Sequence, residues 1–189
     1  MTSLPNSNIW KTPNKIDSQT VFKESIVNIQ LDTLQMGEDE PYPYYSLLTP
    51  PRAVAILATT SDGKLIINEE YRHPTGHFLL GCPGGFIDDG ETPIQAAERE
   101  LLEETGYKAE SYKILGSAYP YSGFSIQKTI YIRAKNAKLT CDPQRERSEI
   151  IHVHLLKLQA LNQLIINGNP IDGVLCTALY LNYLDEGLS

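Results

Sequence analysis

Runs of apolar residues separated by Gly and Pro predict many short strands, one internal helix and two helices near the C-terminus. The segment before residue 21 is rich in Asn, Ser, Thr and Pro, and we expect it to be irregular. The run at 52–60 is short and apolar, and Asp62-Gly63 follows it, which indicates a buried strand that turns back through a hairpin. The predicted strands are 21–34, 44–48, 52–60, 65–71, 112–119, 125–134 and 149–156.

Two helices are predicted near the C-terminus, at 158–167 and 172–184, with Gly168-Asn169-Pro170 as the break between them. The polar stretch at 135–147 contains a proline and is expected to be a long connection. Long connections in compact domains are often functional, so this one is a place to look for site residues.

The internal helix has clear signals at both ends. Thr92 suits the N-cap position, Pro93 the first helical position, and Gln95 completes a capping box. Gly106 supplies a C-terminal stop. The sequence therefore predicts a helix of about thirteen residues between these signals, which is an ordinary helix length.

This predicted helix has an acidic side. Glu100, Glu103 and Glu104 are neighbours at i, i+3 and i+4 spacing, and only Arg99 is well placed to offset their repulsion. The carboxylates form either a solvated acidic face or a site for a hard divalent cation such as Mg²⁺, which prefers oxygen ligands. The glycine loop and cap on the same segment favour the metal. Another side of the helix is expected to pack on a core and contains Ile94, Ala97, Leu101 and Thr105.

The segment resembles the Nudix box, a pattern of glycine, glutamate and arginine at fixed spacing. The resemblance implies an α/β fold, an α/β/α sandwich with a mixed sheet, here with a small N-terminal β extension. It also implies hydrolysis of a nucleoside diphosphate linked to another moiety. One position departs from the pattern, where Tyr107 replaces an aliphatic residue. The matching residues are Gly85, Glu91, Arg99-Glu100-Leu101, Glu103-Glu104 and Gly106.

The same resemblance implies roles for the residues of the box. The metal, Mg²⁺ or alternatively Mn²⁺, would be bound by the Gly84 carbonyl and by the carboxylates of Glu100, Glu103 and Glu104. Arg99 would support the site through an ion pair with Glu91.

Segments outside the box resemble the ADP-ribose pyrophosphatase branch of this family. Tyr71-Arg72-His73-Pro74 is similar to a turn of that branch in which the arginine contacts substrate, so Arg72 is the expected phosphate or ribose contact. Residues 119–125 are similar to its loop after the box. Three residues depart from the branch pattern and leave the substrate open: Gly81, Ser122 and Gln127.

The expected reaction is hydrolysis of ADP-ribose to AMP and ribose 5-phosphate. GDP-mannose or another nucleotide sugar is the alternative substrate. A non-catalytic nucleotide-sensing module is the alternative without chemistry, but such modules typically lose box glutamates, and this chain keeps them all. An isomerase of isoprenoid diphosphates would need a further catalytic cysteine and glutamate, for which we find no placement.

Two further site functions have several candidate residues. In the branch, a late loop supplies a glutamate near the metals, and here Glu146 and Glu149 are candidates, with Glu149 preferred. The general base is Glu146, Glu149 or a glutamate of the box. The adenine needs an aromatic face, which the branch often takes from its N-terminal extension across a dimer. The aromatic candidates are Trp10, Phe22, Tyr44 and Tyr45. Phe124, in the loop after the box, is a further expected substrate contact.

Three other residues are assigned no chemistry. His152 and His154 alternate on a predicted strand and share a face, but the sequence supplies no third metal ligand near them. Cys82 lies beside the glycine loop without an apparent base, so we interpret it as a packed thiol.

Composition limits the partners and the location. The 189 residues carry a net charge of −7, which argues against a nucleic-acid backbone as partner. No apolar run approaches the length of a transmembrane helix, so no membrane partner is expected. Three cysteines without metal-like spacing favour a reducing cytoplasm. We expect a β-rich extension at 1–50 that makes a homodimer, and the hydrolase domain at 51–189.

Overall fold

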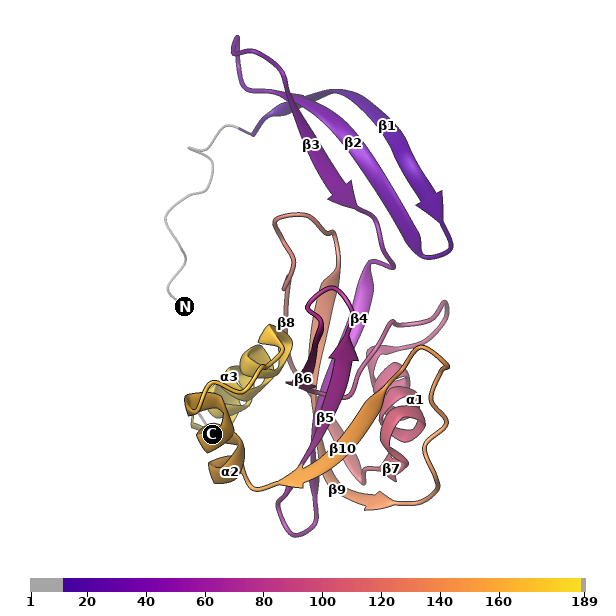
Figure 1. Cartoon of the computed structure of the whole chain (residues 1–189), viewed down its shortest axis with the longest axis vertical. Helices are drawn as coiled ribbons and strands as arrows, with labels where there is room; N and C mark the ends of the chain where they lie inside the picture. Colours follow the sequence, from indigo (N-terminus) through magenta and orange to yellow (C-terminus); the bar gives the residue numbers. More distant parts are fainter. Residues whose placement is uncertain (1–11, 188–189) are drawn as a thin grey trace. The chain divides into compact units, whose positions relative to one another are not determined.

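The computed structural model of the chain describes residues 12–187 and divides them into two compact units (Figure 1). The first unit contains the N-terminal residues up to Pro51 together with Tyr121–Gln127. The second contains Arg52–Pro120 and the chain from Lys128 onward. Whether the first unit makes a dimer stays a prediction.

A three-stranded antiparallel sheet forms most of the first unit. Its strands are β1 (Asn14–Glu24), β2 (Val27–Gln35) and β3 (Tyr42–Leu47), in that order. The expectation that residues before 21 are irregular is wrong for β1, whose backbone pairs with β2 from Asn14 opposite Gln35 to Glu24 opposite Val27. The side chains of β1 are exposed along its whole length, so no apolar alternation marks this strand in the sequence.

A seven-stranded mixed sheet forms the centre of the second unit. The order is β10-β5-β4-β9-β7, with β6 paired to β5 and β8 paired to β9. β4 and β9 run parallel, and the other pairs are antiparallel. The strands are β4 (Arg52–Thr60), β5 (Leu65–Arg72), β6 (His77–Gly81), β7 (Tyr107–Lys108), β8 (Ser111–Ala118), β9 (Lys128–Leu139) and β10 (Ile151–Leu156).

β9 is longer than the sequence predicts. The sequence predicts a connection from residue 135, but the strand continues to Leu139. The cause is its pairing, since Tyr107 of β7 lies opposite Leu139 and Ser111 of β8 lies opposite Lys135. Polar residues continue as a strand here because neighbouring strands satisfy their backbone groups.

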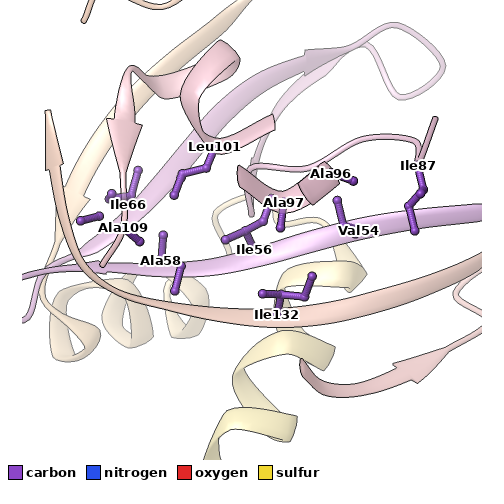
Figure 2. Close-up of a cluster of buried hydrophobic side chains, with 12 residues drawn as sticks. Val54, Ile56, Ala58, Ile66, Ile87, Ala96, Ala97, Leu101, Ala109 and Ile132 are labelled. Carbon is purple, nitrogen blue, oxygen red and sulfur yellow. The ribbon is translucent and has the colours of Figure 1, made fainter. Parts of the chain in front are cut away.

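Helices cover both faces of this sheet. Successive side chains of β4 point to opposite faces, and residues 53–58 are all buried, so both faces must be covered. Val54, Ile56 and Ala58 pack under α1 (Pro93–Thr105) (Figure 2). Ala55 and Leu57 belong to a second core with residues of α2 (Leu158–Ile166) and α3 (Gly173–Gly187). The expected α/β/α sandwich with a mixed sheet is confirmed.

Each helix lies close to its predicted position. Within residues 12–187, no helix combines the length and the apolar character needed to cross a membrane.

Candidate active site

A glycine loop lies against the backbone of β4. The amides of Val54 and Ile56 donate to the carbonyls of Gly85 and Pro83, both at 2.8 Å. A Cβ on Gly84 would lie 2.2 Å from the Val54 carbonyl oxygen, and a Cβ on Gly85 would lie 2.3 Å from Oε1 of Glu100. The two glycines therefore let a backbone and a carboxylate approach the loop more closely than any side chain would allow.

The predicted helix and its caps are confirmed. Thr92 accepts a hydrogen bond from the Gln95 amide, and Gln95 accepts one from the Thr92 amide, which completes the capping box. Pro93 opens the helix, and Gly106 ends it in the left-handed conformation, with φ 76°. These local signals fix where α1 begins and ends, and so they place its glutamates.

Arg99 organises one side of the site. Its Nε and Nη2 donate to the two carboxylate oxygens of Glu91 at 2.9 and 3.0 Å, and Nη2 also donates to the Phe86 carbonyl at 3.0 Å. Nη1 donates to Glu100 at 2.8 Å and to Glu103 at 3.1 Å. Hydrogen bonding by Arg99 lowers the pKa of Glu91, and the Glu91 carboxylate raises the pKa of Arg99 in return. The guanidinium thus joins the loop before α1 to the acidic side of the helix.

Glu104 is the most enclosed carboxylate of the helix, with 5% of its surface exposed. Its Oε2 accepts from Nδ2 of Asn68 and from the Gly84 amide, both at 2.9 Å. Glu100 is also buried, so the alternative of a solvated acidic face is wrong for these two residues. Burying a carboxylate is costly unless it is hydrogen-bonded or paired, which marks Glu104 as a site residue rather than a surface charge.

Negative charges from three segments interact around Glu104: α1, β5 and the loop before β10. Burial raises its pKa well above the usual range, and the carboxylates of Glu100, Glu149 and Glu70 raise it further, while the Gly84 amide opposes the shift. Burial likewise raises the pKa of Glu100, with Arg99 opposing and Glu149 adding. The preferred late-loop residue, Glu149, is thus electrostatically coupled to the box, whereas Glu146 is exposed.

Arg72 lies at the end of β5 and pairs with Glu70 through Nη2 at 2.8 Å. Asn68, Glu70 and Arg72 alternate along the strand, so they share the face that meets α1. Burial raises the pKa of Glu70, and Arg72 opposes that shift. Half of the Arg72 side chain remains exposed, so it keeps hydrogen-bond donors for a substrate.

The other predicted substrate contacts lie in the first unit. Tyr44 donates through its hydroxyl to the Gly123 carbonyl at 2.8 Å, and the ring of Phe124 lies 5.9 Å from that of Tyr121. Both residues are exposed, and their contact with a substrate stays a prediction. Phe22 and Tyr45 are exposed as well, and Trp10 lies outside the described residues.

The carboxylate oxygens of the site are suitable ligands for a hard cation. Among residues 12–187, no three His, Cys, Asp or Glu side chains are arranged as they stand to hold a metal ion, and Glu100 and Glu103 are bound to Arg99 instead. Oxygen donors are the ligands that Mg²⁺ and Mn²⁺ take. A divalent cation would also stabilise the charged carboxylates of Glu100 and Glu104, which burial and mutual repulsion disfavour. The donor set therefore fits the metal, and the individual ligands, Gly84 included, stay predictions.

Residues 49–176, more than half of the chain, match the NUDIX domain. The chain belongs to the Nudix family. It is 24% identical over 174 residues to the ADP-ribose pyrophosphatase of Bacillus subtilis, covering 92% of this chain and 94% of that protein. It is 32% identical over 174 residues, with the same coverage, to the methanol dehydrogenase activator of Bacillus methanolicus.

A solved structure shares the fold of this Nudix chain. It is the crystal structure of an ADP compounds hydrolase, which matches with a TM-score of 0.80 at 24% identity and covers 94% of this chain and 95% of that one. The predictions of a Nudix pyrophosphohydrolase and of a resemblance to ADP-ribose pyrophosphatases are confirmed.

Sequence reasoning missed Asn68 and Glu70. Both interrupt a strand whose first three residues are apolar, and Asn68 is 1% exposed. A polar residue in the middle of a buried strand needs a partner, so this interruption is the signal that would have found them. The partner itself follows from the packing of β5 near α1, which no local pattern reveals.

Proposed function

We propose that this Nudix protein hydrolyses a nucleoside diphosphate derivative with Mg²⁺, or alternatively Mn²⁺, and that ADP-ribose is the substrate. One observation carries the proposal: the buried Glu104 carboxylate, held by Asn68 and Gly84, is surrounded by the charges of Glu70, Glu100 and Glu149. Burying several negative charges together costs free energy when no cation is bound. A divalent cation with oxygen ligands would offset that cost. The ADP-ribose pyrophosphatase of Bacillus subtilis supports the choice of substrate.

In this proposal, the oxygen of a water attacks one phosphorus of ADP-ribose, and the bridging P–O bond breaks to leave AMP and ribose 5-phosphate. Mg²⁺, which Glu100, Glu103 and Glu104 would hold, would neutralise the diphosphate and lower the pKa of water at the site. Glu149 accepts the proton of the attacking water, a role supported by its coupling to Glu100 and Glu104. Glu146 is the alternative base, which its exposure disfavours.

Glu100, Glu103 and Glu104, with the Gly84 carbonyl, are the proposed ligands. Arg99 acts through these residues, since it contacts Glu100 and Glu103 and fixes the loop through Glu91. It is therefore a positioning residue. Its five donors in a rigid fork suit this task better than a lysine would.

Arg72 is the proposed contact to the substrate's phosphate or ribose. Its ion pair with Glu70 places the guanidinium on the strand face that carries Asn68. An aromatic ring of the first unit, from Tyr44 or Phe124, would stack on the adenine. The proposal also includes a homodimer through the first unit, supported by the exposed strand β1. It further includes a cytoplasmic location, supported by three free cysteines among the described residues.

A phosphate-release panel tests the proposal. Purified protein with Mg²⁺ is given ADP-ribose, GDP-mannose, NADH, diadenosine polyphosphates and nucleoside triphosphates, each with and without EDTA. We expect ADP-ribose to be preferred and its turnover to be lost with EDTA. Preference for GDP-mannose would retain the metal chemistry and overturn the substrate, directing attention to Gly81, Ser122 and Gln127. Folded, Mg²⁺-binding protein without turnover of any compound would favour a nucleotide-sensing module.

A second candidate function is activation of a methanol dehydrogenase. The methanol dehydrogenase activator of Bacillus methanolicus is 32% identical over nearly the whole chain, a higher identity than that of the ADP-ribose pyrophosphatase. The test is the rate of a purified methanol dehydrogenase with and without this protein. Stimulation by wild type that Glu104→Gln abolishes would tie activation to the Nudix site, and the absence of stimulation would exclude this function.

A further inference from the structure

A pocket of about 220 Å³ lies on the face of the second unit's sheet that is opposite to α1. Its apolar walls come from Phe78, Leu80, Leu156 and Leu164, and its polar wall from Glu69 and His154. Successive side chains of a strand point to opposite faces. Since Asn68 reaches Glu104 of α1, its neighbour Glu69 points away from the Nudix carboxylates. The pocket is thus separated from the candidate active site by the sheet.

The polar wall is a pair of side chains that can make further hydrogen bonds. Nε2 of His154 lies 2.8 Å from Oε2 of Glu69, and about two-fifths of each side chain is exposed. A carboxylate can accept several hydrogen bonds, so Glu69 retains Oε1 for a ligand donor. This wall therefore favours a ligand that presents an N–H group and disfavours one that presents a phosphate.

The aromatic wall is held in place. Phe78 is 40% exposed, and its ring centroid lies 5.5 Å from that of Tyr71 and 5.9 Å from that of His152. These contacts hold the Phe78 ring from neighbouring strands β5 and β10. A fixed, partly exposed ring is a surface on which a planar ligand stacks at little entropic cost.

The remaining wall is fixed by backbone hydrogen bonds. The Leu80 amide donates to the Pro170 carbonyl at 3.0 Å, and the Asp172 amide donates to the Leu80 carbonyl at 2.9 Å. The segment after α2 is thereby attached to β6, and Asn169 caps the Leu164 carbonyl through Nδ2 at 3.0 Å. The pocket is therefore formed before any ligand arrives.

We propose that this pocket binds an uncharged nucleobase or nucleoside, with the base between Phe78 and the leucines and an N–H group on Glu69. Its volume of about 220 Å³ is below the roughly 300–1,000 Å³ of drug-sized sites, so the pocket is too small to enclose an intact nucleoside diphosphate sugar. The Nudix carboxylates lie across the sheet, so binding needs no metal. The site is independent of the proposed hydrolysis.

Histidine ring signals in NMR report on this pocket directly. The chain has four histidines, so the His154 ring is assignable with a His154→Gln variant. Adenosine is titrated into the protein in EDTA, with AMP in parallel. We expect saturable shifts of the His154 signals with adenosine and at least tenfold weaker binding of AMP. The absence of a saturable shift with adenosine would overturn the proposal.

Two variants locate the ligand. Phe78→Leu removes the stacking surface and Leu164→Trp fills the cavity, and each is expected to weaken adenosine binding at least tenfold while thermal melts verify folding. Tyr183→Leu, which removes an exposed ring of α3 outside the pocket, is the control and should bind as wild type does. Equal binding by wild type and folded Phe78→Leu would overturn the proposal. Loss of binding in Glu104→Gln would place adenosine in the Nudix site instead and would also overturn it.

Discussion

The side chains of Asn68 and Glu104 form a buried hydrogen bond between a strand and a helix, with Nδ2 of Asn68 2.9 Å from Oε2 of Glu104. The two residues are 1% and 5% exposed, respectively. The bond and the nearby Gly84 amide together fix one carboxylate of α1 relative to β5 and the glycine loop. The position of Glu104 therefore depends on a residue outside the Nudix box.

The variant Asn68→Ala should lose both stability and activity. Removing a donor from a buried carboxylate costs about 1–3 kcal/mol in the free energy of unfolding. Glu104 then keeps only the Gly84 amide of these two donors, so we expect kcat to fall at least tenfold. Urea unfolding and steady-state kinetics measure the two effects. Asn162→Ala, on the exposed side of α2, is the control and should stay within about 0.5 kcal/mol of wild type.

Replacing Glu104 with Gln should separate stability from function. The amide keeps the shape of the side chain and removes a charge that burial and neighbouring carboxylates disfavour. Without metal, we therefore expect the melting temperature to be equal to or above that of wild type, while turnover is abolished. Wild type should be stabilised by Mg²⁺, by about 2.7 kcal/mol at a hundredfold excess over Kd, and Glu104→Gln much less.

The matched control for that change is Glu98→Gln, on the exposed side of the same helix. It should leave turnover and the response to Mg²⁺ as in wild type. Wild-type turnover by Glu104→Gln would sink the metal-ligand assignment. A melting temperature lowered by several degrees in the absence of Mg²⁺ would contradict the electrostatic argument.

The variant Gly85→Ala should damage the site while leaving the fold intact. Its Cβ would lie 2.3 Å from Oε1 of Glu100, so the carboxylate must move. We expect a loss of at least tenfold in kcat/KM with a small change in the melting temperature. Gly84→Ala should instead destabilise the whole domain, because its Cβ would lie 2.2 Å from the Val54 carbonyl oxygen in the backbone of β4.

Gly173→Ala serves as the control for both glycine variants. A Cβ at Gly173 meets no atom within 4 Å, so the change should be neutral or slightly stabilising. Kinetics and thermal melts of the three variants check the series. Full activity of Gly85→Ala would mean that the observed position of Glu100 is unimportant for turnover.

The sequence predicts α1 closely because its signals are local. Thr92, Pro93, Gln95 and Gly106 each act within one turn of the helix end that they define, and the structure contains each feature. The long register between β1 and β2 depends instead on residues distant in sequence. A fully exposed strand has no buried apolar face to set a period, so the sequence predicts irregular structure for residues 14–20.

The residues of the candidate site also divide into those that local sequence predicts and those that depend on packing. Arg99, Glu100, Glu103 and Glu104 follow from one helix and its spacing. Glu70 comes from another strand, and its involvement depends on how the sheet packs near α1. Sequence patterns give the residues of one element, and packing decides which other elements complete the site.

The three cysteines should differ in reactivity. Burial raises the pKa of the Cys82 thiol far above its usual range, and the nearby carboxylates of Asp172 and Glu104 add to this shift. A raised pKa means less thiolate at pH 8, and the thiolate is the reacting species. Cys141 and Cys176 are exposed. Ellman's reagent should therefore react quickly with two thiols of the native protein and with the third only after unfolding. A rapid reaction of Cys82, identified by mass spectrometry, would contradict this.

The last prediction concerns the association of two chains through the first unit. β1 is an edge of the three-stranded sheet and exposes Ile16 and Phe22, at 51% and 47%. A small sheet with apolar side chains in water gains stability when a partner covers it, and an unprotected edge strand favours pairing. We therefore expect a homodimer in sedimentation velocity.

The double variant Ile16→Lys and Phe22→Lys should shift the dimer toward monomer, because Lys opposes association at edge strands. Since both side chains are exposed, the change should leave the melting temperature of the second unit unaltered. Leu139→Lys, an equally apolar and exposed position at the end of β9 in the second unit, should remain dimeric. A wild type that sediments as a monomer at every concentration would exclude the dimer. Dissociation by Leu139→Lys alone would instead move the interface to the second unit.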